Sequence, residues 1–141
     1  ENLGAGKPYL VDERIEDFLE AKCLDKLRKP KDAEVLYNKV IDDTQQKFGG
    51  YNSAVYLYIL ALRNLKKYEL IDNYIKNWEL HRPEDNILKW CKAKLQNNYQ
   101  EALKVENQIN TTTGGTPWDP KYADPEFEII KTIADIFSKD E

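Results

Sequence analysis

Apolar residues recur every three or four positions in seven separate stretches of this 141-residue chain, and this spacing constrains its fold more than any other feature. In an α-helix, such spacing places the apolar side chains on one face, where they pack against a neighbouring element. Proline, glycine or asparagine follows most of the stretches and stops the helical pattern. We therefore expect an all-α fold of about seven helices.

The third stretch departs from this pattern, because residues 55–62 are apolar without interruption. A helix of this kind packs against neighbours on several sides. A buried β-strand is the alternative for so continuous an apolar run. The length of the run and the continued spacing from Leu62 to Leu65 favour a helix.

Short connections group the stretches into three pairs followed by one further helix. The pairs lie near residues 12–48, 52–82 and 85–110, with a loop at 111–123 and a last helix at 124–138. Helices joined by tight turns pack as antiparallel neighbours, so we expect each pair to form one antiparallel unit.

The turn inside each pair has the same residue pattern, which indicates an internal repeat. In each turn, a proline or tyrosine stands three positions before a residue that we expect to pack in the core. These positions are Pro30 and Ala33, Tyr68 and Ile71, and Tyr99 and Ala102. The packing residues are 38 and 31 positions apart, and periods of this size are typical of helical repeats.

This pattern resembles the tetratricopeptide repeat family across residues 12–110. The matching positions are Ala21, Leu24, Ala33, Tyr37 and Val40 in the first pair, Leu62, Tyr68, Ile71, Ile75 and Pro83 in the second, and Ala93, Tyr99, Ala102 and Ile109 in the third. Ile59 and Trp90 stand where the family has a small residue, and they imply wider or irregular helix packing. The resemblance implies a short right-handed α-solenoid of stacked antiparallel pairs, with a generic helical bundle as the alternative.

The resemblance also implies a binding surface, because repeats of this family bind peptides or proteins on a concave surface lined by first helices. Carried over to this chain, that lining comprises Phe18, Lys22, Lys26, Tyr56, Leu60, Arg63, Asn64 and Lys94. Its four basic side chains would suit an acidic peptide or a chain-terminal carboxylate. Trp118 and Tyr122 are a second candidate contact, with a buried anchor as the alternative. We expect the last helix to cap the exposed end of the third pair.

The start of the chain carries a second, shorter resemblance. Gly4, Gly6 and Pro8 disfavour regular structure, so we interpret residues 1–8 as a linker into one helical repeat domain at 9–141. Residues 2–7 are similar to a segment before the C-terminal helical repeats of large uncharacterised bacterial proteins, which carry an upstream β-sandwich related to galactose mutarotases. The chain contains no Met, which predicts a processed form or a fragment. Its compartment stays open, with bacterial cytoplasm and periplasm as the alternatives.

The charge distribution and the residue spacing argue against nucleic-acid binding, a membrane-spanning helix and a metal site. The 21 basic and 25 acidic residues are interleaved, whereas nucleic-acid binding needs clustered Lys and Arg. No apolar run approaches the roughly 20 residues of a membrane-spanning helix. With one histidine and no close cysteine pair, we expect no zinc site, and we expect Cys23 and Cys91 to be small buried hydrophobes.

No group of residues carries recognisable catalytic chemistry, so we expect no catalytic residue and no cofactor. The segment from Gly4 to Lys7 lacks the glycine spacing of a phosphate loop. We therefore expect a non-catalytic module that contacts a protein or peptide segment, or a neighbouring domain of the same chain. The alternative is a C-terminal supporting domain of a larger carbohydrate-related enzyme whose active site lies upstream.

Overall fold

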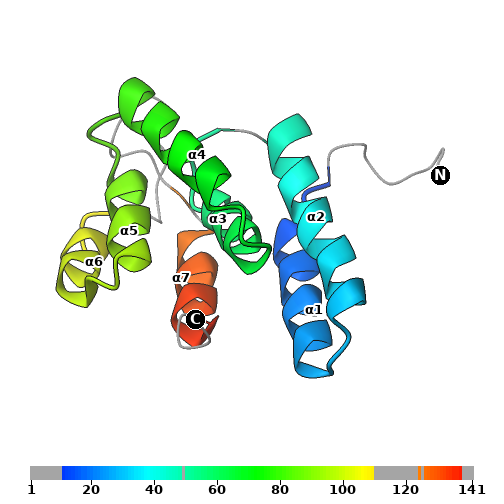
Figure 1. Cartoon of the computed structure of the whole chain (residues 1–141). Helices are drawn as coiled ribbons and strands as arrows, with labels where there is room; N and C mark the ends of the chain where they lie inside the picture. Colours follow the sequence, from blue (N-terminus) through cyan, green and yellow to red (C-terminus); the bar gives the residue numbers. More distant parts are fainter. Residues whose placement is uncertain (1–10, 49, 110–123, 125, 138–141) are drawn as a thin grey trace.

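The computed structural model describes residues 11–48, 50–109, 124 and 126–137, and within these ranges it contains seven α-helices and no strand (Figure 1). The helices are α1 (Arg14–Lys26), α2 (Pro30–Gln46), α3 (Val55–Asn64), α4 (Tyr68–His81), α5 (Asn86–Leu95), α6 (Tyr99–Glu106) and α7 (Phe127–Phe137). The expected all-α fold is confirmed. The continuous apolar run at 55–62 is helical and lies within α3.

Local sequence explains where several of these helices begin. Pro30 is the first residue of α2, where its missing N–H costs no hydrogen bond. The Asp85 carboxylate caps α5 by accepting a hydrogen bond from the Ile87 backbone N–H at 2.9 Å. Asn98 caps α6 in the same way, through the N–H of Glu101 at 3.2 Å.

The turn inside each pair has the same backbone geometry in all three pairs. Each turn contains one residue in the left-handed region, namely Arg28, Lys66 and Asn97, with φ of 62°, 61° and 57°. In each turn, the next N–H donates to the carbonyl five residues earlier, as in a Schellman helix end. These bonds run from Lys29 to Leu24, from Lys67 to Leu62 and from Asn98 to Ala93, at 2.8, 2.9 and 2.8 Å. The left-handed residues are 38 and 31 positions apart, as are the packing residues Ala33, Ile71 and Ala102. The backbone geometry of the turn therefore recurs at the same interval as the residue pattern.

The pairs stack side by side around α3. Helix α1 packs on α2, α2 on α3 and α5 on α6, and α1 also contacts α3. On the other side of α3, the ring of Tyr56 contacts the ring of Trp90 in α5, with centroids 4.9 Å apart. The first helices α1, α3 and α5 are therefore neighbours in that order. Each side chain from 55 to 62 is at most 3% exposed, so α3 is covered on all sides.

Helix α7 lies between α1 and α5 in Figure 1. Its first ring, Phe127, contacts Trp90 of α5 with centroids 5.0 Å apart, and its last ring, Phe137, contacts Phe18 of α1 at 6.1 Å. Because α3 lies between α1 and α5, α7 contacts the first helices on both sides of α3. This position differs from the expected cap on the end of the third pair. We call the surface under α7, formed by α1, α3 and α5, the first-helix face.

Candidate functional site

The first-helix face holds α7 through polar contacts as well as rings. Just before α7, the Asp124 carboxylate accepts two hydrogen bonds from Ser53, one from its backbone N–H and one from its hydroxyl, both at 2.7 Å. Towards the other end, the Lys94 ammonium donates to Asp135 at 2.7 Å. These contacts fasten α7 to the start of α3 and to α5.

Lys22 of α1 meets the C-terminal end of α7 in a different way. Its ammonium lies 5.4 Å from the centre of the Phe137 ring and 5.8 Å from that of Phe18, and it donates a hydrogen bond to the side-chain oxygen of Asn64 at 3.2 Å. Cation–π attraction and an amide acceptor together compensate for burying this charge. Lys22 thus joins α1, α3 and α7 at one point.

The predicted lining of the concave surface falls into three groups in the structure. Phe18, Lys22, Tyr56, Leu60 and Lys94 are buried, Arg63 and Asn64 are half-buried, and Lys26 is exposed. The structure brings Lys22 and Asn64 into contact, and Lys94 into contact with a carboxylate of the same chain. Most of the predicted lining is therefore an interior surface, with α7 as the helix that lies on it. Trp118 and Tyr122 lie outside the described residues.

Sequence reasoning missed the residues that fasten α7. Ser53 and Asp124 are 71 positions apart and both buried, and nothing in either local sequence indicates the other. The buried side of α7 comprises Phe127, Ile130, Ile133 and Ala134. Its outer side keeps two large apolar residues in contact with solvent, Ile129 and Ile136, at 51% and 57% exposure.

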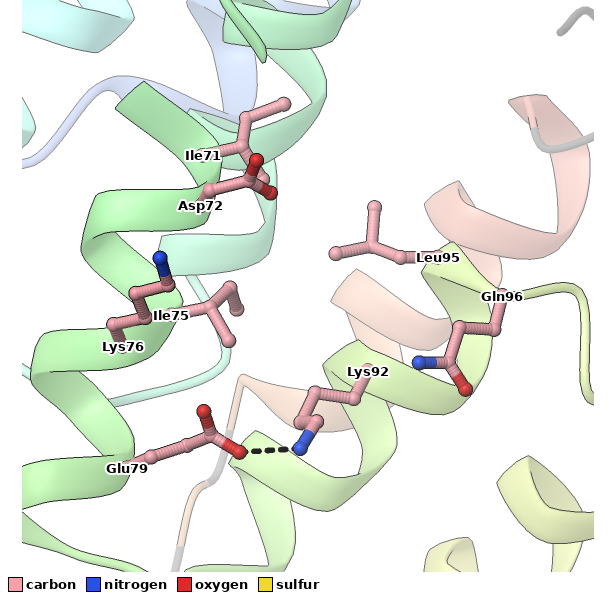
Figure 2. A pocket seen from close by; sticks show the side chains of 8 residues that line it. All are labelled: Ile71, Asp72, Ile75, Lys76, Glu79, Lys92, Leu95 and Gln96. Atoms are coloured by element: carbon pink, nitrogen blue, oxygen red, sulfur yellow. Dashed lines mark hydrogen bonds and ion pairs between the residues drawn. The ribbon is translucent and has the colours of Figure 1, made fainter. Parts of the chain in front are cut away.

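A pocket of about 310 Å³ lies between α4 and α5, at the junction of the second and third pairs (Figure 2). Ile71, Ile75 and Leu95 supply apolar side chains to it. Figure 2 shows Glu79 and Lys92 facing each other across one end, where they form an ion pair.

A second pocket, of about 270 Å³, lies at the preceding junction, between α2 and α3. Four of its lining residues stand at the repeat positions of four residues in the first pocket. The matching positions are Glu34 and Asp72, Tyr37 and Ile75, Asn64 and Leu95, and Leu65 and Gln96. The two pockets are therefore a consequence of the repeat, one at each junction between pairs.

The two cysteines of the described residues differ in burial. Burial, with smaller effects from Asp85 and Asp124, raises the pKa of the Cys91 thiol, which keeps it protonated and a poor nucleophile. Cys23 is exposed on the outer side of α1, so the expectation that both cysteines are buried is wrong for this one. Within the described ranges, no group of three or more His, Cys, Asp or Glu side chains could hold a metal ion. No helix described there combines the length and apolar character needed to cross a membrane.

Comparisons with known proteins add no relative to this picture: no family model, no curated protein and no solved structure matches the chain.

Proposed function

We propose that this chain is a non-catalytic helical-repeat module that makes protein–protein or interdomain contacts by holding an amphipathic helix on its first-helix face. In the structure described above, the chain's own α7 occupies that face. A partner helix, or a helix from a neighbouring domain, would take the same place when α7 leaves it.

One observation carries this proposal: α7 is bound by side chains from the first helices α1 and α5, and Asp124 just before it is bound by Ser53 just before α3. Phe18 and Lys22 come from α1, Trp90 and Lys94 come from α5, and Ser53 precedes α3. Rings at both ends of a helix with aliphatic side chains between them are the usual anchors of helix-in-groove recognition. A surface with this composition accepts helices of one pattern, whichever chain supplies them.

The outer side of α7 gives a physical reason for exchange. Ile129 and Ile136 remain exposed when α7 packs on the first-helix face, so α7 has a second apolar side that stays in contact with solvent. A partner helix of the same pattern would replace the contacts of α7 one for one, while the released α7 could cover its outer isoleucines elsewhere.

A peptide-binding experiment on the full chain tests this proposal. Phe137→Ala removes the ring contact with Phe18 and Lys22 but alters no residue of the first-helix face. A fluorescent peptide of residues 124–141 should bind this variant saturably and at least tenfold more tightly than it binds the wild-type chain. The reason is that a tethered α7 competes at an effective concentration of about 1 mM. Fluorescence anisotropy measures both affinities.

Ile136→Ala is the matched control, because Ile136 is the neighbouring apolar residue but points away from the face. This variant should bind the peptide as weakly as the wild-type chain. Hydrogen exchange reports whether α7 of the Phe137→Ala variant is released. A chain whose α7 amides exchange rapidly and that still binds no peptide would contradict the proposed function.

A further inference from the structure

We infer that the first-helix face selects its helix by charge: a partner must bring a carboxylate to Lys94, in the position that Asp135 occupies in α7. This inference rests on the proposed function, because it names the chemistry of the partner for the same face. It commits to an acidic amphipathic helix as that partner.

The burial of Lys94 carries the argument. Its side chain is 4% exposed, whereas that of its partner Asp135 is 59% exposed. The charge that folding removes from water therefore belongs to the face and not to the helix that lies on it. A buried ammonium without an acidic partner is costly, since its lost hydration is not replaced. The ring of Tyr99, 5.8 Å from the ammonium, compensates for only part of that loss.

Ser53 requires a second hydrogen-bond acceptor from the bound helix, at the opposite end of the first-helix face from Lys94. It is fully buried, and both its N–H and its hydroxyl donate to Asp124. An occupant without an acceptor here would leave two buried donors unsatisfied. The two acidic residues of the occupant are eleven positions apart in the sequence of α7 and its preceding turn.

Between these acids, the face sets the apolar pattern. Phe127 and Phe137 bear the two rings, and Ile130 and Ile133 are the buried aliphatic residues between them. The occupant that fits therefore has the form acid-x2-Phe-x2-Ile-x2-Ile-Ala-acid-x-Phe, where the Ala position is buried and x marks a position that this pattern does not fix. Near the last ring of this pattern, the Lys22 ammonium lies over Phe137 and donates to Asn64.

The test compares two peptides of residues 124–141 that differ at one atom group, the native sequence and Asp135→Asn. Both are titrated into the Phe137→Ala chain. We expect the Asn peptide to bind about tenfold more weakly, the size of effect seen when a charged hydrogen bond loses its charge at a partly exposed site. In a chain that also carries Lys94→Met, the difference in affinity between the two peptides should shrink, since no buried ammonium remains to select between them.

The outcomes separate this inference from the function on which it rests. If both peptides bind the Phe137→Ala chain with the same affinity, selection by charge is refuted while the helix-binding face stands. If neither binds, the proposed function itself fails. A dimer of the chain without peptide, seen by light scattering, would make α7 of a second copy the occupant and refute the committed partner.

A second measurement needs no peptide and guards against a variant that does not fold. In the intact chain, Asp135→Asn should lower the midpoint of urea unfolding when Lys94 is present. The same change should lower the midpoint less in a Lys94→Met background. Equal shifts in the two backgrounds would overturn the inference.

Discussion

Asp124→Ala is expected to destabilise the chain far more than its position outside every helix suggests. Asp124 is 7% exposed and Ser53 is fully buried, so the two 2.7 Å hydrogen bonds between them are shielded from water. The alanine variant leaves both Ser53 donors without this acceptor. Each buried unsatisfied donor costs about 1–3 kcal/mol, so we expect the loss of both to lower the free energy of unfolding by about 2–6 kcal/mol.

Urea denaturation followed by circular dichroism measures this loss as a shift of the unfolding midpoint. Asp124→Asn keeps one side-chain oxygen as an acceptor, so it should fall between the wild-type chain and Asp124→Ala. Ser53→Ala removes the hydroxyl donor but keeps the backbone N–H. Because the two residues are in contact, the double variant should lose less free energy of unfolding than the sum of the two single losses.

Asp42→Ala is the matched control, since Asp42 is an exposed aspartate on α2. Exposed substitutions of this kind usually change stability by less than about 0.5 kcal/mol. If Asp124→Ala costs no more than Asp42→Ala, then Asp124 does not fasten α7 to the start of α3, and the account of the first-helix face given above is refuted at that end.

Two further changes test the turns and the charge near α7. Lys66→Gly should raise the free energy of unfolding by about 0.5–1 kcal/mol, because Lys66 has a φ of 61° that strains a residue with a Cβ. Asn97→Gly should change it less, since Asn tolerates this region of φ. Thermal unfolding compares the two variants, and a loss of stability with Lys66→Gly would refute the strain at Lys66. Burial raises the pKa of Glu126, and the negative charges of Asp12 and Asp124 raise it further. The folded chain therefore keeps a proton that the unfolded chain releases. Its stability falls as the pH rises from 4.5, the ordinary pKa of this carboxyl, through the raised pKa of the folded state. Glu126→Gln should therefore stabilise the chain at pH 7 and flatten that decline, and unchanged urea midpoints across this pH range would contradict it.

The repeat could be predicted from the sequence because its signals are local. Pro30, Tyr68 and Tyr99 each stand two residues after a left-handed residue, and the buried packing residue follows three positions later. A turn and the first turn of the next helix involve residues within a few positions of one another. Their geometry is therefore set by short-range sterics and hydrogen bonds that a single sequence displays.

The surface on which α7 packs could not be predicted in the same way. Amphipathic spacing identifies which side of a helix is buried, but it does not identify the surface that buries it. Phe137 meets Phe18 and Asp124 meets Ser53 across most of the fold, so both contacts depend on how three pairs stack. Lys94 is predicted to line a concave binding surface, and in the structure its ammonium donates to Asp135 of the same chain.

One signal for an occupied face was nevertheless present in α3. An open groove would leave the groove side of its central helix facing solvent, and that side would carry polar or isolated apolar residues. Residues 55–62 are instead apolar on every side, and all of them are buried. Tyr56 and Leu60 were expected to line an open groove, although the same run was expected to pack on several sides, and these two expectations conflict. Since neighbouring pairs cover α3 from two directions, the remaining apolar side requires another helix, and α7, which contacts the first helices on both sides of α3, is the helix available to cover it. A first helix that is apolar all round therefore predicts a helix-filled face rather than a vacant groove.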